Sequence, residues 1–120
     1  MTAYSLNVLL VEDQRLIQKA TSRLLSKFNF KVSIASTGAQ ALEMAKDNNY
    51  DLILMDIGLP DYDGLTVTSE IRQINTSVPI IGLTAQELTE DEYSNCGMND
   101  LIIKPLSTEK VLRVVYYNIK

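Results

Sequence analysis

Short apolar runs alternate with longer amphipathic stretches along the whole chain of 120 residues. The first run, 6–11, is apolar except at Asn7, and the third, 52–55, is continuously apolar, as expected of strands buried on both faces of a sheet. The second, 31–35, is shorter and more polar, which favours a place near an edge. Two further runs, 80–83 and 101–103, complete a set of five predicted strands.

A helix is predicted after each strand. After the first strand, apolar residues recur at helical spacing and are expected to face the core: Leu16, Ile17, Ala20, Leu24 and Phe28. Later helices are predicted at 38–48, at 65–74, from about residue 89 and at 107–119, the last capped by Ser107. The inward residues of the second and third helices are predicted to be Ala41, Leu42 and Ala45, and Val67, Ile71 and Ile74.

Five successive strand–helix units predict the α/β class, with a doubly wound parallel sheet and helices on both faces. The reason is that parallel strands need crossover connections, which are usually helical and almost always right-handed. The length suits one domain covering 1–120 and is too short for two. Ligands of such sheets bind outside the carboxyl ends of the strands, near the point where strand order reverses. Functional residues are therefore expected at that edge.

Composition argues against several classes of function. The net charge is −4 without any run of Lys and Arg, so nucleic-acid binding is not expected. No apolar stretch approaches the length of a membrane span, and the first five residues lack the features of a signal peptide. The single cysteine, Cys96, fits a reducing cytoplasm. The absence of histidine from the sequence removes the usual catalytic triads, the usual zinc sites and any internal phosphohistidine.

Polar residues follow four of the predicted strands directly. Glu12 and Asp13 come after the first strand, Asp56 after the third, Thr84 after the fourth and Lys104 after the fifth. Taken singly, each has an ordinary explanation such as a helix cap, a turn or a solvated cation. In the predicted topology they converge on one crevice, which then holds three carboxylates, one ammonium and one hydroxyl.

That combination predicts phosphoryl chemistry. Three carboxylates at close range repel one another unless a cation joins them, and oxygen ligands without His or thiolate suit Mg²⁺ or Mn²⁺. With the metal, Lys104 and Thr84 would form a receptor for a phosphoryl group, and Asp56 could attack phosphorus to give an acyl phosphate. The sequence contains no GxxxxGK[ST] or GxGxxG motif, so ATP binding is not expected.

Four segments in this order resemble the receiver domain of bacterial two-component response regulators, over essentially the whole chain. They are "VLLVED" (8–13), "DLILMDIGLPDYDG" (51–64), "PIIGLTA" (79–85) and "GMNDLIIKP" (97–105). The likeness is greatest to receivers attached to hybrid sensor histidine kinases. It implies a flavodoxin-like (βα)5 fold with strand order 2-1-3-4-5.

The resemblance also implies a metal site and a phosphoacceptor. Asp56 would be the phosphoacceptor. Asp13, Asp56 and the carbonyl of Gly58 would bind Mg²⁺, with Mn²⁺ as an alternative, and Glu12 would hold metal-bound water.

Three further residues would bind the phosphate. Thr84 and the N–H of Ala85 would grip the phosphoryl oxygens, while Lys104 would pair with them as a point charge. The family often has a cis peptide at the position of Lys104-Pro105.

The implied partner is a histidine kinase or a histidine phosphotransfer domain. The chain would be a cytoplasmic phosphorelay protein or a domain excised from a larger protein, including the cytoplasmic part of a membrane-bound sensor kinase. A degenerate receiver, acting as an interaction module without phosphorylation, is the main alternative, and the retained polar residues of the crevice argue against it. A haloacid dehalogenase-type phosphatase needs a second aspartate where Gly58 stands. A flavodoxin-like electron carrier needs a phosphate-binding loop after the first strand, which this sequence lacks.

Two departures from the family and one surface bear on output. Leu101 stands where the family usually has Tyr or Phe, and the segment 84–97 is slightly short, so the fourth helix is predicted to be short or irregular. The last helix has more apolar positions than one buried stripe requires: Val111, Leu112, Val114, Val115, Tyr116, Tyr117 and Ile119. It is either wedged deeply into the core or a contact surface, for a partner domain or a weak homodimer.

Overall fold

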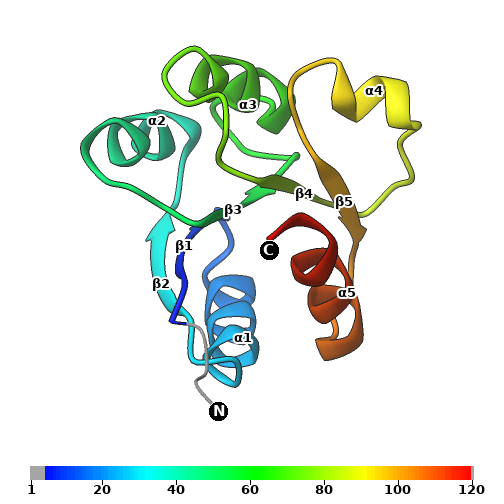
Figure 1. Ribbon diagram of the computed structural model, residues 1–120. Coiled ribbons are helices and arrows are strands. Elements are labelled where there is room, and N and C mark those ends of the chain that lie inside the picture. Colours follow the sequence, from blue (N-terminus) through cyan, green and yellow to red (C-terminus); the bar gives the residue numbers. More distant parts are fainter. Residues whose placement is uncertain (1–4, 120) are drawn as a thin grey trace.

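The computed structural model describes residues 5–119, in which five strands alternate with five helices (Figure 1). The strands are β1 (Asn7–Val11), β2 (Lys31–Ala35), β3 (Leu52–Asp56), β4 (Ile80–Thr84) and β5 (Asp100–Ile103). The helices are α1 (Arg15–Ser26), α2 (Gly38–Asp47), α3 (Gly64–Arg72), α4 (Glu90–Ser94) and α5 (Thr108–Asn118). Each predicted element is present.

The strands form one parallel sheet in the order β2-β1-β3-β4-β5, which confirms the predicted fold class and strand order. Helices α1 and α5 pack on one face of the sheet, and α2, α3 and α4 on the other (Figure 1). Strand β1 pairs with β2 on one side and with β3 on the other, so strand order reverses between β1 and β3. The expected ligand edge therefore lies at the carboxyl ends of these two strands.

Alternate residues of the central strands build two separate cores, because successive side chains of a strand point to opposite faces. On the α1 and α5 side the buried strand residues are Val8, Leu10, Leu52, Leu54, Ile81, Leu83 and Ile102. On the α2, α3 and α4 side they are Leu9, Val11, Ala35, Ile53, Met55 and Ile80. Strands β3 and β4 are buried along their whole length.

The predicted inward face of α1 was wrong in part. Leu16 is 82% exposed and Ala20 is also exposed, whereas Thr21 and Leu25 are the buried residues of the helix. The helix therefore presents a different face to the core from the one predicted, and this face includes Thr21. Ile74 was also expected to face inward and is 47% exposed, because α3 ends two residues before it.

Side-chain caps define where four of the helices, α2 to α5, begin. Ser107 accepts a hydrogen bond from the N–H of Lys110 at the start of α5, which confirms the predicted cap. Helix α4 has only five residues, as the short segment predicted, and its start is fixed by a reciprocal pair between Thr89 and Glu92. The N-cap residue of α1 is Gln14 and makes no side-chain capping bond, so capping does not account for Asp13.

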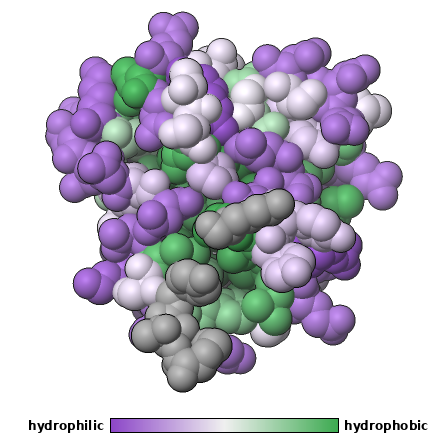
Figure 2. All heavy atoms as spheres, viewed as in Figure 1, coloured by the Kyte–Doolittle hydropathy of each residue, from purple (hydrophilic) through white to green (hydrophobic). Residues whose placement is uncertain are grey.

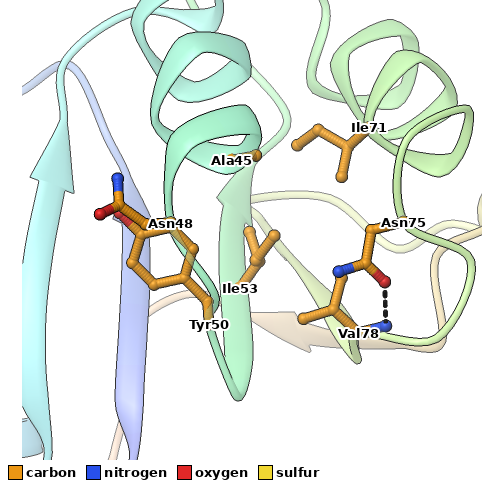
Figure 3. A pocket seen from close by; sticks show the side chains of 7 residues that line it. All are labelled: Ala45, Asn48, Tyr50, Ile53, Ile71, Asn75 and Val78. Carbon is orange, nitrogen blue, oxygen red and sulfur yellow. Dashed lines mark hydrogen bonds between the residues drawn. The ribbon is translucent and has the colours of Figure 1, made fainter.

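A small cavity lies away from the predicted ligand edge. A cavity of about 10 Å³ lies between α2 and α3, beside Tyr50 and Val78 near the amino ends of β3 and β4 (Figure 3). It is large enough for about one water molecule. Polar residues cover most of the face in Figure 2, with apolar residues showing where Figure 1 places α1 and α5. Within residues 5–119, no helix has the length and apolar character that crossing a membrane requires.

Candidate functional site

The carboxyl ends of β1, β3, β4 and β5 carry the predicted site residues. In the pairing register, Val11 lies opposite Met55, Asp56 opposite Leu83, and Thr84 opposite Ile103. The four strand ends therefore lie side by side. Because β3 is wholly apolar up to its last residue, it brings the carboxylate of Asp56 to this edge at only 5% exposure.

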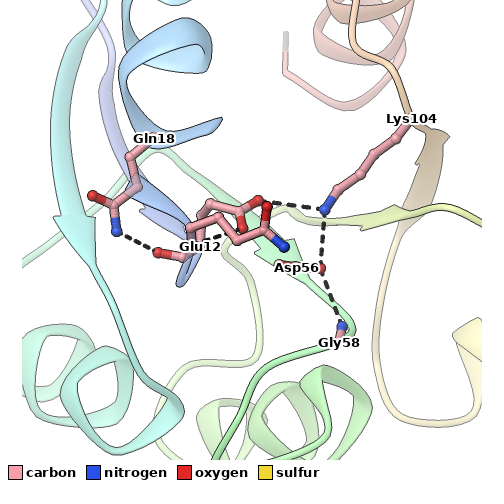
Figure 4. A network of polar contacts seen from close by, with 6 residues as sticks. Glu12, Gln18, Asp56, Gly58 and Lys104 are labelled. Atoms are coloured by element: carbon pink, nitrogen blue, oxygen red, sulfur yellow. Dashed lines mark hydrogen bonds and ion pairs between the residues drawn. The ribbon is translucent and has the colours of Figure 1, made fainter. Parts of the chain in front are cut away.

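One ammonium group joins two of the carboxylates. Lys104 Nζ lies 3.4 Å from Glu12 Oε1 and 3.4 Å from Asp56 Oδ1 (Figure 4). The Glu12 side chain is fully buried, that of Asp56 is 7% exposed and that of Lys104 is 22% exposed. Ion pairs this far from solvent are screened much less than surface pairs. The Lys104–Pro105 peptide is cis, in agreement with what the resemblance implied.

The environment of Glu12 opposes its ionisation. Burial raises the pKa of Glu12 to about 7, and the negative charge of Asp56 acts in the same direction. The N–H of Gln14, which donates to Glu12 Oε2 at 3.2 Å, and the charge of Lys104 oppose this rise. Burial is the largest of these effects. Any additional positive charge in the crevice would stabilise the ionised form of Glu12 and so lower its pKa.

Three carboxylates offer a site for a cation. Glu12, Asp13 and Asp56 can each present one oxygen so that all three lie within 4.8 Å of one another. Asp13 Oδ1 is buried, and no hydrogen-bond donor reaches it from the described part of the chain. A buried acceptor without a donor is unfavourable unless a cation or water satisfies it. Because all the donors are hard oxygens, the set fits Mg²⁺.

The remaining predicted residues follow or end the same strands, and one of them, Gly58, is joined to Asp56 through its backbone. The N–H of Gly58 donates to Asp56 Oδ1 at 3.1 Å. Thr84 is 8% exposed, and its hydroxyl accepts the N–H of Gln86 at 3.1 Å. Ala85 follows it and is exposed. The structure thus gathers all the predicted residues at one edge of the sheet, where ion pairs join Glu12, Asp56 and Lys104.

Sequence reasoning missed one residue that shapes this edge. Gln18, on α1, donates from Nε2 to the backbone carbonyl of Glu12 at 2.6 Å (Figure 4). The same nitrogen donates to Ser36 Oγ at 3.1 Å. It ties the loop after β1 to the loop after β2. A glutamine on the polar side of an amphipathic pattern gives no sequence signal for this role, because its partners are defined only by the fold.

The fold and site define a class of protein, and comparison with known proteins agrees with it. Residues 8–116 match the family model described as the response regulator receiver domain. The chain belongs to that family, whose members act in two-component signalling.

The chain is also similar to parts of individual proteins. It is 41% identical over 115 residues to the aerobic respiration control sensor protein ArcB of Escherichia coli (strain K12), covering 92% of this chain and 15% of ArcB. It is 39% identical over 110 residues to the transcriptional regulatory protein SrrA of Staphylococcus aureus (strain NCTC 8325 / PS 47), covering 89% of this chain and 45% of SrrA. The chain therefore spans less than half of either relative.

Solved structures resemble it over nearly its full length. The receiver domain of the sensor histidine kinase PA1611 from Pseudomonas aeruginosa PAO1 has a TM-score of 0.88 and 36% identity, over 97% of this chain and 98% of that one. A magnesium ion is coordinated in the active site cleft of that structure. The response regulator TrrA from Thermotoga maritima, in complex with Mg²⁺-BeF, has a TM-score of 0.86 and 26% identity, over 94% and 98% of the two chains.

Proposed function

We propose that residues 1–120 act as one phosphoacceptor receiver domain. Asp56 accepts a phosphoryl group from a phosphohistidine donor in a Mg²⁺-dependent reaction, and the acyl phosphate then relays or switches a signal. One observation carries this proposal: the buried carboxylate of Asp56 lies 3.4 Å from Lys104 Nζ, in a cluster that includes the unpartnered Oδ1 of Asp13. The magnesium in the PA1611 receiver supports the same assignment.

The metal would be held by Asp13, by Asp56 and by the carbonyl of Gly58, with Glu12 holding a metal-bound water. When bound, Mg²⁺ neutralises negative charge on the oxygens that it contacts. Burial is the largest cause of the raised pKa of Glu12, and repulsion from Asp56 adds to it; that repulsion would be smaller with the cation in place.

The chain's own groups position the transfer. An oxygen of Asp56 forms a bond to phosphorus while the bond from phosphorus to the imidazole nitrogen of the donor breaks. Lys104, which pairs with Asp56 before the reaction, then neutralises the phosphoryl oxygens. The hydroxyl of Thr84 and the N–H of Ala85 donate hydrogen bonds to those oxygens. Catalysis of this kind depends mainly on position and charge.

A groove beside the acceptor suits the protein that carries the phosphohistidine. It has a volume of about 480 Å³ and lies between α1 and the segment that follows β5, with Lys104 in its wall. The rest of its lining is mainly apolar: Leu16, Ile17, Ala20, Leu24, Pro105 and Leu106. We assign this groove to the histidine kinase or histidine phosphotransfer domain, because a donor docked there is adjacent to the acceptor.

The central test is Asp56→Asn, since an amide cannot form the acyl phosphate. With acetyl phosphate and Mg²⁺, the unsubstituted protein should gain a phosphate adduct in intact-protein mass spectra, and Asp56→Asn should gain none. Adding EDTA should abolish the adduct. Asp51→Asn, which changes an exposed aspartate at the other end of β3, is the matched control and should label normally. Labelling of Asp56→Asn would refute the acceptor assignment, and a folded protein that never labels would favour the degenerate receiver.

A further inference from the structure

The segment between β3 and α3, residues 57–63, is fastened where it begins and where it ends. The N–H of Gly64 donates to the carbonyl of Ile57 at 2.8 Å, and Gly58 and Asp63 form an isolated antiparallel bridge. The segment is thus a closed turn. Because Gly58 is paired with Asp63 across the mouth of the turn, a displacement of its middle would be expected to move Gly58 as well.

The middle of this turn is bound to a different element, α2, through Asp61. Its Oδ1 accepts the N–H of Gly38 at 2.9 Å, and its Oδ2 accepts the N–H of Ala39 at 3.1 Å. The first amides of a helix lack partners within the helix and carry a partial positive charge. The cap residue Thr37 satisfies only the N–H of Gln40 with its side chain. Asp61 therefore completes the cap of α2 from a residue far along the chain.

Close packing accompanies these hydrogen bonds. A Cβ added to Gly38 would lie 2.7 Å from Cδ2 of Tyr62 and 2.7 Å from Cγ2 of Val67. Both neighbours belong to the turn or to the helix that follows it. The start of α2 and the turn are thus in direct contact, and a side chain at position 38 would push them apart.

The negative charge of Asp61 suits its position at the N-terminus of α2, which carries a partial positive charge. The N–H of Gly38 is the largest cause that lowers the pKa of the Asp61 carboxyl, so the group is ionised at neutral pH. Besides Asp61, Leu59 also holds the middle of the turn, by packing partly against the core.

We propose that Asp61 is a positioning residue for the metal site: by fastening the turn to the N-terminus of α2, it fixes Gly58 beside Asp56. This inference rests on the proposed function, in which the carbonyl of Gly58 binds Mg²⁺. Outer partners that orient metal ligands strongly affect metal affinity although they do not touch the metal. Asp61 acts on the metal site in this way, through the turn.

The test compares Mg²⁺ affinity across four variants, by NMR titration of the metal-free protein. Asp61→Ala should weaken Mg²⁺ binding about tenfold, at the lower end of the effect of removing outer-shell partners. Asp61→Asn keeps one acceptor oxygen and should lose less. Gly38→Ala displaces the turn without changing the charge and should also weaken binding. Asp51→Ala is the control, because it removes a carboxylate that accepts a backbone N–H, that of Asn7, at the opposite edge of the sheet.

Two further measurements separate positioning from general damage. In the absence of metal, the amides of Gly38 and Ala39 should exchange with solvent faster in Asp61→Ala than in the unsubstituted protein. At saturating Mg²⁺ the rate of phosphorylation by acetyl phosphate should return to that of the unsubstituted protein, because the turn acts through the metal.

Three outcomes would overturn the inference: unchanged Mg²⁺ affinity in Asp61→Ala despite faster exchange of those amides, an equal loss of affinity in Asp51→Ala, or no effect of Gly38→Ala. Failure of the proposed function looks different. If the unsubstituted protein binds Mg²⁺ but takes no phosphate, the acceptor role is refuted while the comparison of affinities still decides the role of Asp61. If it binds no Mg²⁺, both proposals fall.

Discussion

At the scale of one residue, the surroundings of Glu12 favour its protonated form when no metal is bound. Its side chain is fully buried, and burial raises its pKa to about 7. The folded protein therefore binds this proton more tightly than the unfolded chain does. The resulting contribution to stability is present below the ordinary pKa range of glutamate and is lost as the pH rises through about 7.

We therefore expect the free energy of unfolding of the metal-free protein to fall by roughly 1–3 kcal/mol between about pH 5 and pH 8 because of this group. Glu12→Gln should remove most of that fall and should be the more stable protein at the higher pH. Urea unfolding with EDTA, at a series of pH values, measures both. The absence of histidine leaves few other groups that titrate in this window. Parallel pH curves for the two proteins would contradict the prediction.

The residues of the site divide into those that sequence could locate and those that it could not. Glu12, Asp56 and Lys104 directly follow or end strands, so a parallel sheet requires them to lie at one edge. Gln18 and Asp61 work through contacts with loops and helix ends that lie elsewhere in the sequence. Apart from the Ser36 hydroxyl, their partners are backbone groups, which have no sequence signature, so only the folded chain reveals them.

At the scale of elements, β5 and α4 form the part of the molecule in which output is expected to differ from the family. Leu101 of β5 is half-buried. A Cβ added to Gly82 of β4 would lie 2.8 Å from Leu101 Cδ1 and 2.5 Å from Met98 Sδ, so this glycine makes room for both side chains. Helix α4 has no buried residue. Leu101 is therefore held by packing, while α4 contacts the core through the partly buried side chain of Tyr93.

We expect beryllofluoride with Mg²⁺, a mimic of the aspartyl phosphate, to shift amide resonances strongly between β4 and α4 and only slightly in β5 and α5. The reason is that leucine has neither a flat ring nor a hydroxyl that could take a different partner in a second state, and a ligand can shift only states with which it interacts differently. Leu101→Tyr restores the ring and should enlarge the shifts in α5. Large shifts throughout Ile102, Ile103 and α5 in the unsubstituted protein would contradict the idea.

The spacing of apolar residues predicted where the helices lie better than it predicted which of their side chains face the core. The prediction for α1 placed Leu16 and Ala20 inward because it counted only apolar side chains, whereas the buried stripe contains Thr21. For α3, the predicted helix extended to Ile74. The side chain of Asn75 accepts the N–H groups of Ser77 and Val78, which favours a turn over another helical residue. Both errors arise because short polar side chains can be buried or can end a helix.

At the scale of the whole molecule, two exposed apolar regions lie on different helices. Leu16 is 82% exposed beside the groove at α1. On α5, Leu112, Tyr116 and Tyr117 are exposed by 50%, 79% and 68%, whereas Val111 and Val114 are buried. Helix α5 thus both enters the core and exposes an apolar face. A weak homodimer through this face stays a prediction.

Substituting one residue of each region distinguishes docking from chemistry. Leu16→Asp should slow phosphoryl transfer from a phosphohistidine protein by about tenfold or more, because a charge in an apolar contact removes binding energy. It should leave labelling by acetyl phosphate unchanged, because a small donor needs no docking surface. Leu112→Asp makes the same change on α5 and is the matched control, with normal rates from both donors. Equal slowing by the two variants, or slowing with acetyl phosphate, would exclude the groove as the docking site.

The order of the strands also bears on how the protein avoids aggregation. An open sheet ends in two strands whose outer backbone groups could pair with another chain. Here those strands are β2, where Lys31 and Ser33 are exposed, and β5, which has only four residues and begins with Asp100. The strands richest in Leu, Ile and Val are enclosed between them. The spatial order that brings Asp56 to the middle of the sheet thus also keeps its most aggregation-prone segments away from neighbouring molecules.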